Sequence, residues 1–478
     1  LAGQPDGGNV RNGTGGDLMQ AYSGQRILIL GAARQGLALA RFLAKQGAQV
    51  TLNDNRPAEA LQNAVNSLEG LPIRLAFGGH PLNLLDGAEL VCLSGGIPLT
   101  LPIVQEAARR GIPLSNDSQI FMENVACPVI GITGSAGKTT TTTLVGRMAE
   151  AATKPPRRAW IGGNIGRPLI DHVTQMQPED VAVMELSSFQ LEQMTISPHV
   201  AAVLNITPNH LDRHGTMEAY TAAKARILAF QMGEDVAVLG REDRGAWSLN
   251  EMVRGALVSF GVTRPAEGAS GTFLAGETLC LQTGEIVTEL LPREMIELRG
   301  EHNLLNVLAA CAIGHAAGFP VDAMQAAVSG FRGVPHRLEF VREWNGAAWY
   351  NDSIATAPER TIAAIHSFSE PLVLLLGGRD KNLPWEDLAE LIHQRVDHLV
   401  VFGEAAGKIA VAVGQTREGQ RPYSLARAAN LREAIMAAAA VVEPGDVVLL
   451  SPGGTSFDEF TDFEQRGERY RQWLKDLM

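Results

Sequence analysis

Residues 129–143 read VIGITGSAGKTTTTT, and this stretch decides the fold of the central part of the chain. The apolar residues at 129–133 predict a buried strand, and a glycine turn leads from it into a helix that we expect to begin at Lys138. In such a strand–turn–helix unit, backbone N–H groups at the helix N-terminus surround phosphate oxygens, and the lysine reaches the terminal phosphates. The segment therefore predicts a phosphate-binding loop.

The turn departs from the strict eight-residue phosphate-loop pattern because Ile132 stands where that pattern has its first glycine. The shorter core from Gly134 to Thr139 is intact. A simple glycine turn beside a solvated lysine is the alternative, but it leaves the five successive threonines at 139–143 unexplained. We expect ATP or GTP to be bound by Gly134, Ser135, Ala136, Gly137, Lys138, Thr139 and Thr140, with a Mg²⁺ ion on Thr139.

Transfer of a phosphoryl group also requires a carboxylate beside the metal ion. Glu185 follows an apolar run at 181–184, so it lies at the carboxyl edge of a predicted strand. An acidic residue in that place is otherwise a surface or capping group. Glu185 is the candidate for the carboxylate ligand of Mg²⁺.

A second glycine loop, GAARQG at 31–36, follows a predicted strand at Arg26–Leu30 and precedes a predicted helix at Leu37–Gln46. The next strand ends at Asp54, as in a dinucleotide-binding fold. Ala33 occupies the place of the fingerprint's second glycine, and its β-carbon would crowd a pyrophosphate. The loop favours a nucleotide or sugar nucleotide over NAD(P), with a purely structural loop as the alternative. Asp54 either binds a ribose or base or caps a turn.

The composition is typical of a soluble α/β protein, with 478 residues, 45% of them hydrophobic and 19% charged. A net charge of −12 opposes non-specific binding to nucleic acid or to an anionic membrane. No apolar run approaches the length of a membrane span. Four scattered cysteines without a CxxC pair argue against a zinc site or disulfide framework and fit the cytoplasm. No coiled-coil pattern occurs, so a monomer is expected.

Strand and helix patterns alternate along the chain, which predicts parallel sheets covered by helices on both faces. A chain of 478 residues is too long for one core. We expect an α/β protein of three domains behind a flexible tail at 1–22. These are a Rossmann-like N-terminal domain at 23–118, a P-loop central domain at 119–335 and a Rossmann-like C-terminal domain at 336–478. Residues 257–291 are expected to form a small β insertion.

Further motifs stand in the same order as in the Mur ligases, and the chain resembles that family from about Gly24 to Met478. They are GGNIG at 162–166, ELSSFQ at 185–190, NITPNHLD at 205–212, AAKARI at 222–227, GEHN at 300–303, PHRLE at 335–339 and NDS at 351–353. The resemblance implies an ATP-dependent ligase that adds glutamate, D-glutamate as the commoner case, to UDP-N-acetylmuramoyl-L-alanine. The reaction would pass through an acyl phosphate and release ADP and phosphate, in peptidoglycan synthesis.

The resemblance also implies a role for each matching residue. Lys138, His210 and Lys224 would be catalytic, and two Mg²⁺ ions would be held by Thr139, Glu185, His210 and by Lys224 as a carbamate formed with CO₂. The remaining ATP contacts would be Asn303, Asn306, Arg337 and Asp352. The UDP substrate would contact Gly31, Arg34, Gln35, Gly36, Asp54, Arg56, Ser94, Gly95, Gly96, Asn164 and Gln190. The incoming glutamate would contact Lys381, Ser456, Phe457 and Phe463.

One departure bears on specificity, because Ile354 stands where the best-known family members have a lysine near the glutamate carboxylates. A variant that adds L-glutamate, or another Mur-type amide ligase, is therefore an alternative. An NAD-dependent dehydrogenase that uses the loop at 31–36 leaves the phosphate loop unexplained. A P-loop switch without ligase chemistry would hydrolyse nucleotide regardless of amino acids. In every interpretation of the chain as a ligase, its partners are small molecules.

Overall fold

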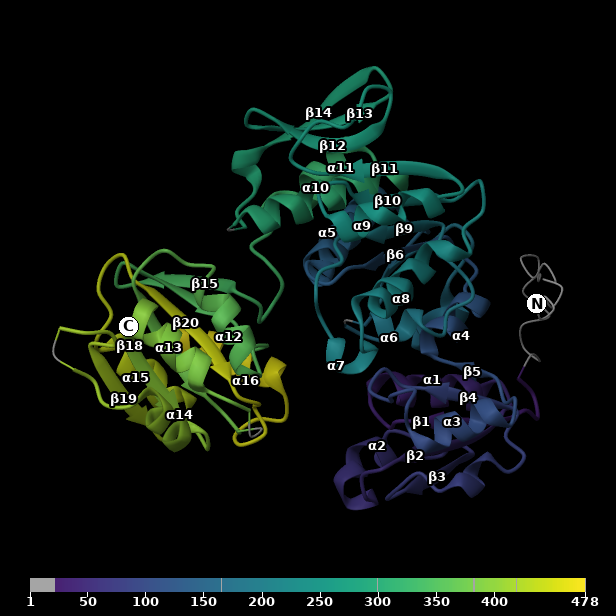
Figure 1. Cartoon of the computed structure of the whole chain (residues 1–478), viewed down its shortest axis with the longest axis horizontal. Helices are drawn as coiled ribbons and strands as arrows, with labels where there is room; N and C mark the ends of the chain where they lie inside the picture. Colours follow the sequence, from purple (N-terminus) through teal and green to yellow (C-terminus); the bar gives the residue numbers. More distant parts are fainter. Residues whose placement is uncertain (1–21, 165, 299, 381–382, 418, 478) are drawn as a thin grey trace. The chain divides into compact units, whose positions relative to one another are not determined.

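The computed structural model describes residues 22–477 apart from 165, 299, 381–382 and 418. Within this part the chain packs into two compact units (Figure 1). The first unit runs to Ile296 and includes His302–Ser329, and the second comprises Glu297–Glu301 and the chain from Gly330. Two sheets lie in the first unit and one in the second, which confirms the three-domain α/β class.

The predicted tail lies outside the described residues except at its end. Tyr22, which we included in the tail, is 8% exposed and belongs to the core of the first unit. Its ring packs edge-on against Phe42, and its hydroxyl donates to Glu123 Oε2 at 3.0 Å. Tyr22 is therefore part of the packed chain.

The first sheet is parallel throughout and has the strand order β3-β2-β1-β4-β5. The strand order reverses between β1 and β4, so the loops that follow these two strands lie side by side, where α/β sheets bind ligands. Helix α1 begins at Arg34, three residues before the predicted start. The strands are β1 (Arg26–Leu30), β2 (Gln49–Asp54), β3 (Ile73–Phe77), β4 (Leu90–Leu93) and β5 (Leu114–Ser115), and the helices are α1 (Arg34–Lys45), α2 (Gln62–Asn66), α3 (Pro102–Arg109) and α4 (Asp117–Asn124).

The central sheet has the order β14-β13-β12-β11-β10-β9-β6-β8-β7. Strand β6 lies between β9 and β8, so the phosphate loop opens between the ends of two neighbouring strands. The strands are β6 (Val129–Thr133), β7 (Ala159–Gly163), β8 (Val181–Glu185), β9 (Val200–Val203), β10 (Val236–Gly240), β11 (Ala256–Phe260), β12 (Ser270–Ala275), β13 (Thr278–Thr283) and β14 (Ile286–Pro292).

The small β insertion expected at 257–291 consists of strands, as predicted, and these strands extend the central sheet. Strand β11 pairs parallel with β10, β12 pairs parallel with β11, and β13 and β14 add antiparallel strands to the same sheet. Short glycine-punctuated strands look alike whether they form a separate hairpin or extend a sheet, and the pattern alone does not show to which edge they pair.

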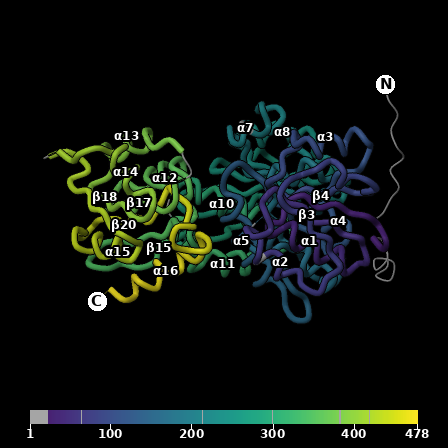
Figure 2. Tube along the Cα trace, turned by 90° about the horizontal axis from the view of Figure 1, so that it is seen from below, coloured from purple at the N-terminus to yellow at the C-terminus, as the bar shows by residue number. Residues whose placement is uncertain are grey.

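Helices cover the central sheet, and α11 lies against α5, the helix that follows the phosphate loop (Figure 2). The helices are α5 (Lys138–Ala152), α6 (Ser188–Leu191), α7 (Leu211–His214), α8 (Met217–Ala229), α9 (Arg244–Trp247), α10 (Glu301–Ala316) and α11 (Val321–Val328). The two sheets of the first unit are joined by Arg41 of α1, whose guanidinium makes a two-pronged ion pair with Asp171 at 2.9–3.2 Å.

The second unit contains a sheet of order β15-β16-β20-β17-β18-β19, in which only the β15–β16 pair is antiparallel. Separate apolar cores lie on its two faces. The strands are β15 (Glu339–Trp344), β16 (Ala347–Asn351), β17 (Leu372–Gly377), β18 (Val396–Phe402), β19 (Ser424–Ala428) and β20 (Val447–Gly453), and the helices are α12 (Pro358–Ile365), α13 (Glu386–Arg395), α14 (Ala406–Val413), α15 (Leu431–Ala439) and α16 (Phe463–Lys475). Across the described residues, no helix combines the length and apolar character needed to cross a bilayer.

Candidate active site

The loop between β6 and α5 has the geometry of a phosphate cradle. Gly137 has φ +80°, and a β-carbon there would lie 2.2 Å from Asn306 Oδ1, so only glycine fits. The ammonium group of Lys138 turns back onto the loop and donates to Gly134 O at 2.8 Å and Ser135 O at 3.4 Å. The lysine is therefore already placed over the loop in which phosphates would lie.

Side chains from other strands and helices hold this loop in shape. Asn205, after β9, accepts from Ala136 N at 2.8 Å and donates to Ala136 O at 3.2 Å. Tyr220 of α8 contacts Ser135 Oγ through its hydroxyl at 3.0 Å. Neither Asn205 nor Tyr220 was predicted as a site residue, although Asn205 opens the motif NITPNHLD at 205–212.

Lys224 lies beneath the same loop. It is 1% exposed, and its Nζ donates to Gly134 O at 2.9 Å and Thr133 Oγ1 at 3.4 Å. Burial lowers the pKa of this amine to about 7; the positive charge of Lys138 lowers it further, while Glu185 acts in the opposite direction. A lysine in an AAK stretch on a helix is usually solvated, so its burial here is the unusual feature.

Glu185, at the end of β8, is the acidic member of the group. It is 2% exposed, and its Oε1 accepts from Asn164 Nδ2 at 3.0 Å. Its Oε2 is buried and has no hydrogen-bond partner among the described residues. A buried carboxylate oxygen of this kind, near the hydroxyl-rich start of α5, is a donor suited to Mg²⁺, so the residues present fit the metal. The structure thus brings Lys138, Lys224, Glu185 and Asn164 together.

His210 is placed differently from these residues. It is exposed, has a left-handed backbone with φ +53°, and precedes α7. Its ring packs edge-on against Phe189, with 5.1 Å between ring centroids. Within the described part of the chain, no three His, Cys, Asp or Glu side chains gather as a metal-binding group. Its role as a metal ligand stays a prediction.

The first glycine loop packs closely against the loop after β4. A β-carbon on Gly31 would lie 2.7 Å from Ser94 Cβ, and one on Gly36 would lie 1.9 Å from Gly31 O. Gly31 is therefore required for the two loops to meet at the strand-order reversal. Gly36 is required for the close turn of its own loop. Arg34 and Gln35 form the first turn of α1, and Ser94 leads into Gly95 and Gly96.

Asp54 was expected either to bind a ribose or base or to cap a turn, and its contacts are those of a cap. Its carboxylate accepts from Ala32 N at 2.8 Å and from the Arg56 guanidinium at 2.8 and 2.9 Å. Burial alone would raise the pKa of Asp54, but the hydrogen bonds from Arg56 and the Ala32 backbone outweigh it and hold the pKa well below its usual range. A ribose or base contact of Asp54 stays a prediction.

A small pocket connects the two sheets of the first unit. Its lining is Leu93, Ser94, Gly95, Ile97, Leu99, Asn116, Phe189, Gln190, Glu192, Gln193 and Arg213. It therefore joins three of the residues predicted for the UDP substrate, namely Ser94, Gly95 and Gln190. Arg213 closes one side by donating to Gly95 O at 3.2 Å and to Ile97 O, with its guanidinium 4.1 Å from the centre of the Phe189 ring. Sequence reasoning missed Arg213.

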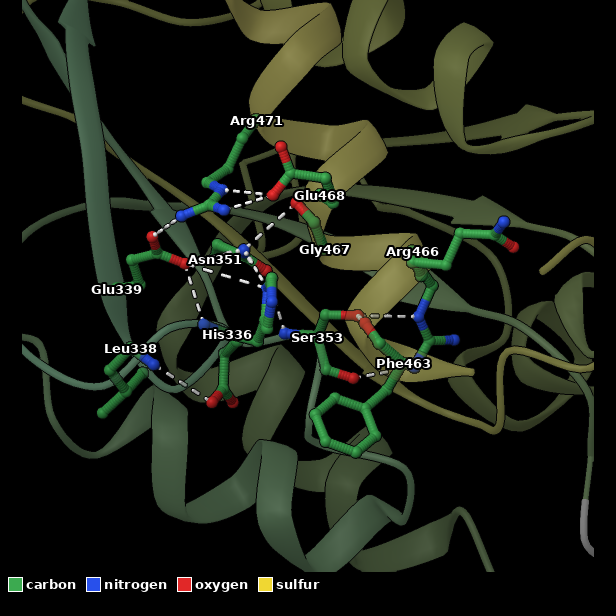
Figure 3. Close-up of polar contacts among 12 residues, drawn as sticks. His336, Leu338, Glu339, Asn351, Ser353, Phe463, Arg466, Gly467, Glu468 and Arg471 are labelled. Carbon is green, nitrogen blue, oxygen red and sulfur yellow. Dashed lines mark hydrogen bonds and ion pairs between the residues drawn. The ribbon is translucent and has the colours of Figure 1, made fainter. Parts of the chain in front are cut away.

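In the second unit, Asp352 directly follows β16 and is buried. Its carboxylate accepts from Ser451 Oγ at 2.8 Å and Leu338 N at 3.2 Å, and burial nevertheless raises its pKa to about 7. The nearby backbone is held by Asn351, which contacts His336 Nδ1 and Glu339 Oε2 at 3.0 Å each (Figure 3). Arg337 lies in the turn between these contacts.

One of the predicted glutamate contacts, Phe463, is linked through Ser353 to a buried cation, Arg466 of α16. Its guanidinium donates to Ser353 Oγ and O at 3.0 and 2.9 Å and to Gly454 O at 3.1 Å, and Ser353 Oγ donates to Phe463 O at 2.8 Å (Figure 3). Ser456 is buried and Phe457 is 59% exposed. The predicted contact Lys381 lies outside the described residues.

Comparisons with known proteins point to one family. Family models match residues 25–116 as a Mur ligase MurD-like N-terminal domain, 132–314 as a Mur ligase middle domain and 336–454 as a Mur ligase glutamate ligase domain. UDP-N-acetylmuramoylalanine–D-glutamate ligases from Symbiobacterium thermophilum and Pelotomaculum thermopropionicum are each 39% identical to this chain. The first alignment covers 95% of this chain and 98% of that protein, and the second 96% and 99%.

Solved structures share the fold at lower identity. The UDP-N-acetylmuramate–alanine ligase MurC of Thermotoga maritima matches with a TM-score of 0.54 and 18% identity, covering 95% of this chain and 100% of that chain. MurF of Acinetobacter baumannii matches with a TM-score of 0.53 and 21% identity, covering 96% and 92%. The motifs, the phosphate loop with its buried lysine and carboxylate, and these matches lead to one conclusion: the chain belongs to the Mur ligase family.

Proposed function

We propose that this protein is an ADP-forming ligase that joins D-glutamate to UDP-N-acetylmuramoyl-L-alanine, in the cytoplasmic stage of peptidoglycan synthesis. The observation that carries the proposal is the group formed by Lys138, Lys224 and Glu185 at the phosphate loop of a chain whose full-length relatives bear that name. The first unit supplies the pocket for the UDP substrate, and the second supplies residues around Arg466 for glutamate.

The chemistry explains why these residue types are needed. A carboxylate is a poor electrophile at neutral pH, so the γ-phosphoryl group of ATP is first transferred to the alanine carboxylate, giving an acyl phosphate and ADP. The neutral amine of glutamate then attacks the acyl carbon, and the tetrahedral intermediate expels phosphate. The loop N–H groups and Lys138 hold the triphosphate, and Lys138 exchanges Gly134 O for a phosphate oxygen. Mg²⁺ on Glu185 and Thr139 would offset the repulsion between the anionic reactants.

Lys224 is proposed to act as a carbamate. The ammonium group would first lose one proton, and the neutral Nζ would then attack the carbon of CO₂ and release a second proton, which converts a buried cation into an anion. The surroundings favour that change, because an ammonium group here is almost fully buried and lies near the like charge of Lys138. The resulting oxygens could serve a second Mg²⁺ together with His210.

Lys224→Ala tests the carbamate. We expect it to lose most activity and to regain part of it when short carboxylates are added, because they can occupy the vacated space and supply oxygens. Lys224→Arg is the matched control, because it keeps the positive charge but cannot form the carbamate and should not be rescued. An unaffected Lys224→Ala enzyme would refute the carbamate.

The choice of glutamate enantiomer is the finer part of the proposal. The relatives are named as D-glutamate ligases. Ile354 offers no cation to the glutamate carboxylates, and on that observation addition of L-glutamate is the second candidate.

One assay decides among these functions: release of phosphate from ATP in the presence of UDP-N-acetylmuramoyl-L-alanine and a panel of amino acids, with both glutamate enantiomers. We expect release only when the muramoyl nucleotide and D-glutamate are both present. Release with the muramoyl nucleotide and L-glutamate, but not with D-glutamate, assigns the L-glutamate-adding reaction. Release that is equal without either substrate removes the ligase function and leaves a simple nucleotide hydrolase.

A further inference from the structure

Two buried polar side chains face each other where the first and central sheets meet. Asp117 is the first residue of α4 and is 6% exposed, and Gln190 of α6 is 1% exposed. The Asp117 carboxyl faces the Gln190 side-chain amide. Neither Asp117 Oδ1 nor Gln190 Nε2 completes a hydrogen bond within the part of the chain that the structure describes. Buried polar atoms without partners are costly, so the arrangement calls for a reason.

The orientation of the Gln190 amide is fixed from its other end. Its Oε1 accepts from both Ser187 N and Ser187 Oγ at 3.0 Å, as part of the capping box that starts α6. Because the oxygen is engaged there, the two N–H groups of Nε2 must point away from Ser187.

The backbone of Gln190 is fixed as well, by the residue that precedes Asp117. Asn116 Nδ2 donates to Gln190 O at 2.7 Å, and Asn116 Oδ1 accepts from Gln119 N at 2.8 Å as the N-cap of α4. The start of α4 therefore fixes the main chain of Gln190 through Asn116 and places Asp117 beside the Gln190 amide.

Gln190 and Asn116 also line the pocket that contains Ser94 and Arg213. An amide nitrogen has two N–H groups. If Asp117 accepts a hydrogen bond from one N–H group on the side away from the pocket, the other N–H group is directed into the pocket. Burial raises the pKa of Asp117 to about 6, so the carboxylate form that accepts hydrogen bonds predominates at neutral pH.

We propose that Asp117 is a positioning residue that orients the Gln190 amide, so that the pocket presents an N–H donor to an acceptor oxygen on the muramoyl-peptide part of the UDP substrate. The inference rests on the proposed function, since it assigns the substrate that enters this pocket. The proposal accounts for both unpartnered atoms. Gln190 Nε2 has two N–H groups, of which one would bond to the Asp117 carboxylate and the other to the ligand.

Steady-state kinetics of phosphate release test the proposal. We expect Asp117→Ala to raise the KM for UDP-N-acetylmuramoyl-L-alanine about tenfold, the size of one lost hydrogen bond with a charged partner, while kcat and the KM for ATP stay within about twofold. Asp117→Asn retains an acceptor oxygen and should restore most of the affinity. Ser118→Ala is the matched control, because it removes a buried hydroxyl from the same turn and should leave every constant unchanged.

A double-mutant cycle separates positioning from a general structural effect. In a Gln190→Ala background, Asp117→Ala should change the same KM by less than about twofold, because its partner is already gone. Additive effects overturn the proposal, as does an unchanged KM in Asp117→Ala or a parallel change in the KM for ATP. If Asp117→Ala does not fold, Gln190→Glu with and without Asp117→Asn answers the same question. Asp117→Asn should relieve the repulsion between the two carboxyl groups and lower the raised KM several-fold. An unchanged KM overturns the contact.

The wild-type enzyme distinguishes the two possible failures. A wild-type protein without phosphate release dependent on the muramoyl nucleotide contradicts the proposed function, and the substrate assigned to the pocket falls with it. An active wild-type enzyme with an indifferent Asp117→Ala variant contradicts the positioning role alone.

Discussion

Replacing Arg466 with methionine tests whether one buried guanidinium holds the glutamate end of the site together. The side chain is 0% exposed and bonds to Ser353 and to Gly454 O. Ser353 in turn bonds to Phe463 O, and Gly454 lies two residues before Ser456. Methionine fills a similar volume without any donor, so the segments at Ser353 and Gly454 lose their common partner at once.

Two opposing terms set the effect on stability. Ser353 O and Gly454 O are left without their donor, at about 1–3 kcal/mol each. In the other direction, burial lowers the pKa of Arg466 from 12.5 to about 10, which means that keeping the cation inside costs on the order of 3 kcal/mol. Methionine removes that cost. We therefore expect the free energy of unfolding to fall by only about 0–3 kcal/mol, while the KM for glutamate rises roughly tenfold or more because its contacts are no longer held.

Urea unfolding followed by tryptophan fluorescence measures the first quantity, because Trp344, Trp349, Trp385 and Trp473 all lie in the second unit. Phosphate release with varied glutamate measures the second. Arg469→Met is the matched control, since Arg469 is exposed on the same helix and bonds to Gln472. A loss of stability above about 5 kcal/mol, or an unchanged KM for glutamate, would refute the reasoning.

Three other substitutions have definite expected outcomes. Gly137→Ala should abolish binding of a fluorescent ATP analogue, because the added carbon would lie 2.2 Å from Asn306 Oδ1 in a left-handed backbone; retained binding contradicts the cradle. Glu185→Gln should raise the Mg²⁺ concentration for half-maximal activity at least about tenfold, and an unchanged titration excludes Glu185 as a ligand. Asp54→Asn should destabilise the protein at pH 7, because a carboxyl with a depressed pKa stabilises the fold above the ordinary Asp pKa and loses that effect as pH falls. The difference in thermal stability between wild type and variant should therefore begin to shrink as pH falls below about 4, the ordinary Asp pKa, and should vanish only near the depressed pKa of Asp54. A difference that does not shrink below about pH 4 argues against the ion pair with Arg56.

The sequence predicted best those features that depend on neighbouring residues. The phosphate loop, the start of α5 at Lys138 and the position of Glu185 at the end of β8 all follow from short apolar runs and glycine spacing. The pairing of the strands does not, so the sequence predicted β structure at 257–291 without showing that these strands extend the central sheet. Pairing to an edge strand depends on partners far away in the chain.

Contacts over long separations were missed for the same reason. Asn205 braces the loop at Ala136, 69 residues away, because β9 lies beside β6 in the sheet. Arg213 reaches Gly95 across 118 residues. No periodicity within a window of ten or twenty residues contains that information. The functional role of Lys224 was likewise implied only by the resemblance.

The position of Lys138 has a practical consequence for handling the enzyme. Its ammonium group donates to two carbonyl oxygens of the phosphate loop at the start of a helix, and a tetrahedral oxyanion is a stronger acceptor because it is charged. Phosphate or sulfate buffers should therefore compete with nucleotide and make affinities appear weaker than they are. Kinetic work is better done in zwitterionic sulfonate buffers with chloride salts, and a sulfate ion is the first ligand to look for in crystals grown from ammonium sulfate.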